Sequence, residues 1–402
     1  MQNTIGRIEH EQRPHTRHGD GGKGTSGEFL PGTAILLISN GFLRNYERGF
    51  ANGLAESGAD VTLISSDNTD YPGLHRGVKT VNLRGSQTTD RSRWEKAVNF
   101  VQYQLSLIWY VLCIGLFKRP SARPIVHVFG LIQPPLLFGV FNGLLFKLLS
   151  KRYVLTIHDI LPRDGCTPTT ERFFAWSYKI ADRLVVHTEG MRTNLCAKFA
   201  IDPQHVTVME HGLEPAAFTP GPRDESAPVQ LLAFGHVKHY KGVDVLLEAL
   251  ETYPQPFVLR IVGVSLDPEL TATLRGLIAK HPHSAQISWR DEHVEEAVME
   301  EHFMTSDVLV LPYRHIDQSG VLFQALRFGV PIVATQVGSL GEYVTPEIGE
   351  MCPPNDPAAL RDTLLHLTRR YRHIDRSKIV EASRRWGWTL IVAESLPRAY
   401  TG

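Results

Sequence analysis

Features that would assign a function at once are missing from this chain of 402 residues. Its four cysteines, Cys113, Cys166, Cys196 and Cys352, lie far apart and include no CxxC pair, which predicts a reducing compartment and excludes a cysteine zinc site. The 42 Lys and Arg residues balance 42 Asp and Glu residues, so no global positive field is available for nucleic acid. We therefore expect a cytoplasmic protein that binds no nucleic acid.

The N-terminal segment lacks an apolar run. Residues 1–27 are polar and rich in Gly, His and Arg, with no apolar h-region, so we expect no signal peptide. We predict that residues 1–32 form a disordered tail. Its histidines, His10, His15 and His18, are expected to be solvated rather than to hold a metal.

A dinucleotide fingerprint is missing as well. Residues 33–66 show a strand, a helix that stops at Gly58 and a second strand, which is half of a Rossmann-like unit. They contain no GxGxxG, so an NAD-dependent enzyme is not expected. A second α/β pattern begins after the turn-rich residues 220–228, and 402 residues exceed what one core usually supports. We therefore predict two domains.

Charged residues are scarce between Arg93 and Phe117. This helical pattern ends in thirteen residues without charge, followed by Lys118 and Arg119. Thirteen residues are too few to span a bilayer, which takes about 20. Two interpretations stay open: a core helix, or a monotopic helix that lies on a membrane surface with basic flanks. The next apolar block, residues 131–149, is broken by prolines and fits a helix between two strands.

The most informative stretch is residues 312–342. A strand at residues 307–311 leads into a polar loop, a helix opens at Ser319 and Gly320, and a second strand follows Gly329. In open α/β sheets ligands bind at the carboxyl ends of the strands. A helix that starts with Ser-Gly presents free N–H groups there, which suits a phosphate or diphosphate.

A second polar pair, His158 and Asp159, follows the strand RYVLTI. A histidine at the carboxyl end of a parallel strand is well placed to face a ligand. Further along, ADRLVVHTEGM predicts a strand and then a helix capped by Thr188. Another short strand ends at His211 and Gly212.

Taken in order, the segments ADRLVVHTEGM, EHGLEPAAFTP, LLAFGHVKHYKGVDVLLEAL and ALRFGVPIVATQVGSLGEYV resemble a retaining glycosyltransferase of the GT-B fold. The resemblance is to family 4 (group 1), whose members use nucleotide-diphosphate sugars, and the QSGV loop is similar to that of a bacterial subgroup. It implies an α/β architecture of two Rossmann-like domains facing across a cleft. Residues 33–220 would form the acceptor domain, with residues 388–402 packing back onto it, and residues 221–387 would form the donor domain.

The resemblance also implies how the donor diphosphate is held. In the family, an Arg after a strand's glycine and a Lys five residues later neutralise it without a metal, so no cofactor is expected. Here Gly235 is followed by His236, which departs from the family Arg, while Lys241 matches the family Lys. Lys238 is expected to share the charge, since imidazole is fully charged only when protonated. Arg290 would belong to the loop that binds the base.

The family usually keeps two glutamates around the Ser-Gly helix, and both are replaced here, by Ile316 and Gln324. Asp317 lies one residue from the first position and is expected to substitute for it. Gln324 can still hydrogen-bond a ribose hydroxyl through its amide. The other donor contacts are expected from Gln318, Ser319, Gly320 and Val321.

His158 matches the family histidine beside the donor sugar, so His158, Lys241 and Asp317 are the candidate catalytic residues. Retaining transfer in the family is thought to let the departing phosphate take the acceptor's proton, so no protein nucleophile is expected. Asp159 is expected on the acceptor side, with a helix-capping role as the alternative. Glu342 matches a recurring family glutamate without an assigned role, or caps a helix.

We therefore expect transfer from a UDP- or GDP-sugar to a saccharide or lipid-linked saccharide in cell-surface polysaccharide synthesis, at or near the inner face of the membrane. The base, the sugar and the acceptor stay open. A non-catalytic partner that binds nucleotide sugars is the alternative. A sugar-nucleotide epimerase of the same fold is a third reading, but its motifs are absent.

Overall fold

The computed structural model describes residues 30–39, 44–66, 73–86, 91–130, 136–162, 166–214 and 227–401. Nearly all of the predicted linker at 220–228 and residues 1–29 of the predicted tail lie outside them. The last residues assigned to that tail are part of the fold instead. Leu30 is buried, and its N–H donates to the Ser57 carbonyl at 3.0 Å, because apolar Leu30 packs into the core.

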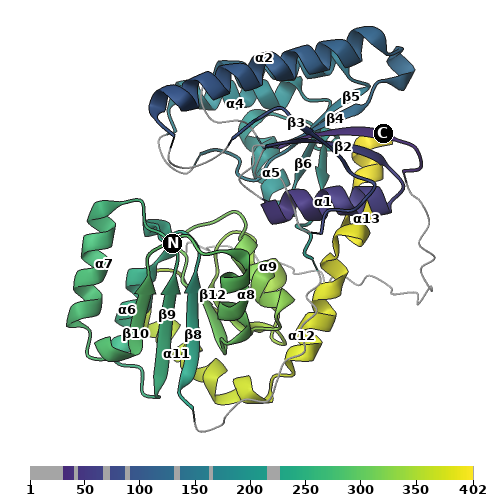
Figure 1. Ribbon diagram of the computed structural model, residues 1–402. Helices are drawn as coiled ribbons and strands as arrows, with labels where there is room; N and C mark the ends of the chain where they lie inside the picture. The colour runs from purple at the N-terminus through teal and green to yellow at the C-terminus, as the bar shows by residue number, and fades with distance from the viewer. Residues whose placement is uncertain are drawn as a thin grey trace, which may run out of the picture.

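The N-terminal domain is built on a parallel sheet of seven strands, in the order β3-β2-β1-β4-β5-β6-β7 (Figure 1). The strands are β1 (Ala34–Ile38), β2 (Asp60–Ser65), β3 (Lys79–Asn82), β4 (Ile125–Phe129), β5 (Arg152–Thr156), β6 (Arg183–Val186) and β7 (Val206–Val208). The helices are α1 (Arg44–Glu56), α2 (Arg93–Phe117), α3 (Leu136–Leu149), α4 (Pro168–Ile180) and α5 (Glu189–Phe199).

The C-terminal domain repeats this topology with six parallel strands, in the order β10-β9-β8-β11-β12-β13. They are β8 (Val229–Phe234), β9 (Phe257–Val262), β10 (Ile287–Arg290), β11 (Val308–Leu311), β12 (Ile332–Thr335) and β13 (Gly349–Cys352). The helices are α6 (Val243–Glu251), α7 (Pro268–Lys280), α8 (Glu296–Met304), α9 (Gly320–Arg327), α10 (Leu340–Tyr343) and α11 (Pro357–Arg370). The predicted α/β class with two Rossmann-like sheets is confirmed.

Helix ends follow from local side chains. Thr188 caps α5 by accepting the Met191 N–H at 3.0 Å, as the sequence predicts. Thr167, not Asp159, caps α4. Ser92 and Glu95 form a reciprocal capping box at the start of α2. These caps set the points where each helix leaves the carboxyl edge of its sheet.

The end of the chain returns to the N-terminal domain through α12 (Arg376–Ser383) and α13 (Trp388–Thr401), as Figure 1 shows. The Trp388 indole lies between Gly49 and Gly212, where a Cβ at Gly49 would come within 1.9 Å of the ring. At the other end of α13, the Tyr400 hydroxyl is 2.6 Å from the His127 Nδ1. Only glycine at position 49 lets α13 lie this close to α1.

Helix α2 corrects the estimate made from its last thirteen residues. The uncharged run extends over residues 97–117, and the helix is long and apolar enough to cross a membrane by length and composition. Only 28% of its most apolar 18-residue window is buried. One side, with Tyr103, Leu107 and Val111, packs into the core while the other side is exposed, so α2 is a core helix on one side only.

Candidate functional site

Lys241 sits in a short 3₁₀ turn, His239–Lys241, between β8 and α6. The turn is held tightly: Gly242 has φ +65°, and a Cβ there would come within 2.0 Å of the Pro312 carbonyl oxygen. The Lys241 side chain is buried, with its Nζ 3.3 Å from the Phe234 carbonyl and 5.2 Å from the centre of the Tyr313 ring. The ammonium therefore lies at the carboxyl end of β8.

Arg314, which follows β11, fixes that turn. Its guanidinium donates to the His239 carbonyl at 2.7 Å and to both carboxylate oxygens of Asp244 at 2.9 and 2.7 Å. Bidentate pairing of this kind sets direction as well as energy. Arg314 thus holds the Lys241 turn against the loop that precedes α9.

Gly235 is the point where three predicted donor-binding elements meet. It has φ +93°, and a Cβ there would come within 2.8 Å of the Lys241 Nζ and 3.3 Å of Val321. Glycine therefore brings the end of β8, the lysine and the start of α9 together.

His236 and Arg290 lie toward the edge of this group. The exposed His236 ring stacks with His293 at 6.3 Å, which places the loop after Arg290 beside it. Partial burial lowers the pKa of His236, and Lys241, His293 and Lys238 lower it further, so the imidazole is neutral near pH 7. Arg290 pairs with Glu292.

The start of α9 has the predicted form. Ser319 is the N-cap, is buried, and has its hydroxyl 3.4 Å from that of Tyr313, while nothing lies within 4 Å of a Cβ built at Gly320. Two amide atoms beside it, the Gln318 Nε2 and the Gln324 Oε1, are buried and have no hydrogen-bond partner in the described part of the chain. Buried polar atoms without partners are costly, which is expected where a ligand completes them.

The residues at the family's first glutamate position, Ile316 and Asp317, are held by the core and by a backbone hydrogen bond. Ile316 is a buried core side chain. The next residue, Asp317, is half-buried, and its carbonyl accepts from the Ser339 hydroxyl at 2.7 Å. The Asp317 backbone is therefore fixed by Ser339.

On the other domain, His158 belongs to a cluster of aromatic rings. Its Nδ1 is 3.0 Å from the His187 Nε2, and its own Nε2 is buried without a partner among the described residues. The Tyr46 ring meets His158 and His211 edge-on at 4.7 and 5.1 Å. Burial lowers the pKa of His158 well below its usual value and brings those of His187 and His211 to about 4 and about 3, so all three are neutral.

Contacts across the two domains bring these groups to one interface. The His211 ring stacks on Phe323 of α9 at 4.8 Å. The pKa of Tyr178 is raised first by burial and then by Asp159 and Asp317, one carboxylate from each domain. Because the Tyr46 ring contacts both His158 and His211, His158 belongs to the side of the N-terminal domain that meets α9.

Glu342 also reaches the N-terminal domain. Its Oε1 lies 4.0 Å from a Cβ built at Gly190, in the first turn of α5. Burial raises its pKa, as do Glu210 and Glu189. The side chain therefore faces the start of a helix in the other domain.

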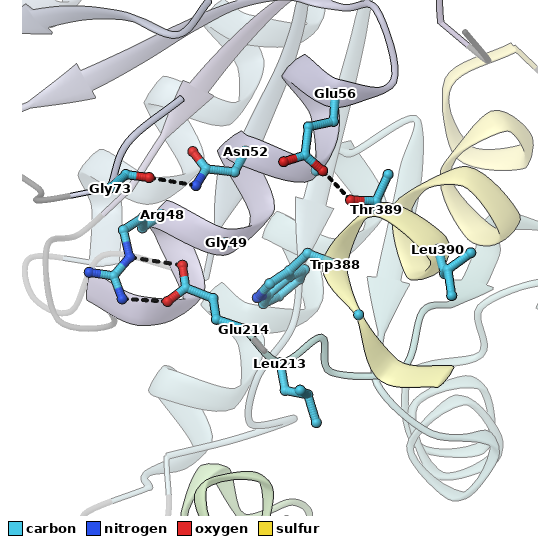
Figure 2. Close-up of a pocket in the computed structure, with 12 residues that line it drawn as sticks. Arg48, Gly49, Asn52, Glu56, Gly73, Leu213, Glu214, Trp388, Thr389 and Leu390 are labelled. Atoms are coloured by element: carbon cyan, nitrogen blue, oxygen red, sulfur yellow. Dashed lines mark hydrogen bonds and ion pairs between the residues drawn. The ribbon is translucent and has the colours of Figure 1, made fainter. Parts of the chain in front are cut away.

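The cavity in Figure 2, of about 530 Å³, is a different place. It lies where α1 meets α13, and its polar groups bind one another: Arg48 pairs with Glu214, and Asn52 donates to the Gly73 carbonyl at 2.9 Å. None of the predicted site residues lines it. Within the described ranges, no group of three His, Cys, Asp or Glu side chains is placed to hold a metal ion.

Sequence reasoning left several members of this arrangement without a role: Tyr46, His187, His211, Tyr313 and Arg314. His187 follows β6 as His158 follows β5, so the criterion that selected one histidine also selects the other. Nothing in the sequence pattern pairs Arg314 with Asp244, 70 residues away.

Two family models match the chain. "Glycosyl transferases group 1" matches residues 228–370, and "Glycosyltransferase Family 4" matches residues 45–217. Among curated proteins, the chain is 28% identical over 189 residues to a GDP-mannose:glycolipid 4-beta-D-mannosyltransferase of Xanthomonas campestris pv. campestris, covering 47% of the chain and 51% of that protein. It is 29% identical over 241 residues to a D-inositol 3-phosphate glycosyltransferase of Xylanimonas cellulosilytica, covering 54% and 56%.

The chain thus spans about half the length of the curated relatives it matches. Solved structures match over nearly all of it. Sucrose-phosphate synthase from Thermosynechococcus elongatus superimposes with a TM-score of 0.67 at 18% identity, covering 89% of this chain and 96% of that one. HepE of Anabaena in complex with UDP-glucose gives 0.65 at 13% identity, covering 91% and 98%. With the two family models matching its two halves, the chain belongs to the GT-B glycosyltransferases.

Proposed function

We propose that the protein transfers a sugar from a UDP- or GDP-sugar to a saccharide or lipid-linked saccharide, with retention of configuration, in the synthesis of a cell-surface glycoconjugate. The diphosphate lies at the N-terminus of α9, against Ser319, Gly320 and Val321, where free N–H groups and the helix dipole favour an anion. Lys241 supplies the fixed positive charge that stabilises the phosphate as the glycosidic bond breaks.

One observation carries this proposal. Among the described residues, three predicted site residues have a buried polar atom without a hydrogen-bond partner: the His158 Nε2, the Gln318 Nε2 and the Gln324 Oε1. They come from both domains and flank the interface where His211 stacks on Phe323. A nucleotide sugar offers hydroxyl and phosphate groups that would satisfy all three at once.

Relatives support the donor class. One relative is named for GDP-mannose, and HepE was solved with UDP-glucose. We propose that no metal takes part, because Lys241 and the α9 N-terminus supply the positive charge; full activity in EDTA would support this, and complete dependence on a divalent ion would contradict it.

Inversion is a second candidate for the stereochemistry. The name of the Xanthomonas relative specifies a beta linkage, and a buried isoleucine occupies the position of the family's first glutamate. Inverting transfer needs a general base for the acceptor hydroxyl, and Asp159 and Asp317, which both raise the pKa of Tyr178 from their two domains, are candidates for it. The anomeric configuration of the product, read by NMR, decides between the two.

A panel of UDP, GDP, ADP and their sugars tests the donor by thermal shift, since a ligand that binds only the folded protein raises its Tm. Release of nucleoside diphosphate with each donor, alone and with acceptor, then tests turnover. Tight nucleotide binding with no turnover for any donor would support the non-catalytic partner. Conversion of the free donor to another sugar nucleotide without acceptor would indicate an epimerase.

A further inference from the structure

Helices α2 and α3 present an unusual outer surface. Along α2, Trp94, Leu105 and Trp109 are 77%, 63% and 69% exposed, and the stripe continues with Val98, Val101, Leu116 and Phe117. Except for Phe117 at the end of the helix, their spacing follows the helical repeat, so they share one side of the helix. The opposite side, with Tyr103, Leu107 and Val111, is buried in the domain. Both sides of α2 are therefore apolar.

Helix α3 extends this surface. It packs beside α2 through a Phe100–Phe138 ring contact of 5.5 Å, and it exposes Leu137, Phe141, Leu144 and Leu148. Trp176 of α4, 54% exposed, adds a further aromatic ring. We call the exposed apolar side chains of α2, α3 and α4 the apolar plate. Monomeric proteins rarely leave such a contiguous patch uncovered, so it is expected to bind something.

Charge around the apolar plate identifies what covers it. Residues 91–152 contain nine Lys or Arg and a single acidic residue, Glu95, whereas the rest of the chain has 33 basic and 41 acidic residues. Lys118, Arg119 and Lys151 are exposed at the ends of α2 and α3. Apolar side chains with tryptophans, flanked by Lys and Arg, fit a bilayer with anionic headgroups.

We propose that the apolar plate docks the protein on the surface of an anionic lipid bilayer. A second copy of the chain is a poorer occupant, because a two-fold interface would bring the basic flanks of one copy against those of the other. A spanning α2 is also disfavoured. It would expose the Gln104–Asn142 hydrogen bond of 2.8 Å and strip Leu107, which is fully buried, from the core.

This placement deepens the proposed function, since a surface-bound enzyme meets a lipid-linked acceptor directly. Figure 1 shows α2 along the edge of the N-terminal domain that is turned away from the C-terminal domain. The donor-binding side would remain in water. Vesicle binding needs neither donor nor acceptor, so its failure and failure of the transfer reaction are distinguishable.

The test is co-sedimentation of the full chain with vesicles of phosphatidylcholine alone or with 30% phosphatidylglycerol, at low and high salt. We expect binding to the anionic vesicles that weakens as salt rises. The double variant Leu105→Glu, Trp109→Glu should bind at least roughly ten-fold more weakly with an unchanged Tm. The matched control, Leu266→Glu with Leu277→Glu, changes two exposed leucines of the C-terminal domain and should bind as the wild type does.

Equal binding by the Leu105→Glu, Trp109→Glu variant would overturn the proposal. So would a dimer, seen by sedimentation, that this variant converts to monomer while no vesicle binds, because the occupant would then be a second copy. Retention of the protein in vesicles after high-salt and carbonate washes would indicate that α2 spans the bilayer.

A separate observation concerns His187. It is fully buried, and its Nδ1 lies 3.0 Å from the Met209 carbonyl, which can only accept, so that nitrogen carries the proton. The neutral ring then has a lone pair on Nε2, and the nearby His158 Nδ1 must donate to it. The remaining His158 nitrogen, Nε2, is therefore left as a buried acceptor without a partner among the described residues.

We infer that His187 is a positioning residue that fixes the tautomer of His158, so that His158 Nε2 accepts a hydrogen bond from a hydroxyl of the bound sugar. Setting a histidine's tautomer through a partner on its other nitrogen is a general device of functional sites. The hydrogen bond to a sugar hydroxyl rests on the proposed function, whereas the tautomer of His158 follows from its contact with His187 alone.

Nitrogen-15 NMR of the ligand-free protein measures the tautomer, with His158 assigned by its own substitution. We expect the Nδ1–H form in the wild type, and a shift toward the Nε2–H form in His187→Leu. In His187→Gln, the amide oxygen can still accept from His158 and should restore the Nδ1–H form. A wild-type Nε2–H tautomer, or no change in His187→Leu, would refute the inference.

His127 offers a matched control, since it is also buried, with its ring nitrogens 2.6 Å from the Tyr400 hydroxyl and 2.7 Å from that of Thr156. His127→Gln should lower Tm without changing the His158 tautomer. For turnover, His187→Leu should lower kcat roughly ten-fold with KM for the donor little changed, because orientation of one acceptor is lost. A rise in KM alone would mean that His187 serves only to shape the donor site.

Discussion

Helices α2 and α8 occupy equivalent positions, since each connects the third strand of its sheet to the fourth. The first has 25 residues, exposes tryptophans and carries one carboxylate. The second has nine residues, of which Glu296, Glu300 and Glu301 are acidic. One topology therefore gives an exposed apolar face in one domain and an acidic helix in the other, where Glu296 pairs with Arg48 of the N-terminal domain at 3.1 Å.

The carboxyl edges of the two sheets also differ, in the charge of the side chains that they carry. Lys241 and Lys238 put fixed positive charge at the edge of the C-terminal domain. The N-terminal edge has His158, His187 and His211, whose pKa values are lowered by burial, so the rings are neutral. Charge is thus placed where a diphosphate is expected, and neutral acceptors where the sugar is expected.

Of these changes, removal of the buried Lys241 ammonium should have the largest effect on turnover. Lys241→Ala should lower turnover roughly 10³-fold, because a charge-assisted contact to the leaving phosphate is lost. Steady-state rates at saturating donor measure this, with Tm as a check on folding. The exposed neighbour gives the control: Lys238→Ala should lower turnover by less than roughly ten-fold. Near-normal turnover in Lys241→Ala would remove the residue from the mechanism.

The neutral histidines should make the N-terminal domain sensitive to acid. His127 and His187 have folded-state pKa values of about 3 and about 4, below the ordinary value of 6.5. The unfolded chain therefore binds more protons, so stability is fully present above pH 6.5 and is lost as the pH falls. Together the two groups should lower the unfolding free energy by roughly 4 kcal/mol between pH 7 and pH 5.

Urea unfolding at pH 7, 6 and 5 measures that loss. His187→Gln carries no titrating imidazole at this position, so its stability should fall less steeply over the same range. A wild-type stability that is flat from pH 7 to pH 5 would mean that the two rings bind protons in the folded protein as readily as in the unfolded chain.

The junction of α1 and α13 offers a smaller change. Gly49→Ala places a methyl group against the buried Trp388 ring and should destabilise the protein by about 1–3 kcal/mol. Gly276→Ala in α7, where nothing lies within 4 Å, should instead stabilise it by up to about 1 kcal/mol. Denaturant midpoints compare the pair, and the same sign for both substitutions would contradict the packing described for α13.

His236→Arg should have the smallest effect. The imidazole is neutral near pH 7 because burial and the neighbouring Lys241 lower its pKa, so an arginine adds a charge that the family normally has there. We expect turnover within a few-fold of the wild type, with a gain at alkaline pH, measured as a kcat/KM profile from pH 6 to 9. A large loss at every pH would show that the ring itself has a specific task.

Features set by neighbouring residues can be predicted from the sequence, whereas features set by contacts between distant residues cannot. Helix α7 (Pro268–Lys280) is bounded by signals that are all local in the sequence: a capping Asp267, a Pro in the first turn and a Lys in the last. Ser319 likewise marks the start of α9. The coupling of His158 to His187 joins two strands, and it becomes visible only when β5 and β6 pair.

Helix α2 shows what the sequence cannot predict. Leucines and aromatic residues occur on both its buried side and its exposed side, so the pattern at residues 93–117 allowed a core helix. Only the packing of one side against α3 and the sheet shows which stripe remains exposed.

The return of α13 has a consequence for synthesis on the ribosome. Val392, Leu396 and Ala399 fill the core that α1 begins, about 350 residues earlier in the chain. About 180 residues separate the end of β7 from α13, so at 5–20 residues per second the first domain waits roughly 10 to 40 s for the helix that completes it. The C-terminal domain, whose strands are contiguous in the sequence, can close before then. Translation order and folding order are therefore expected to be reversed, with the first domain to emerge the last to become stable.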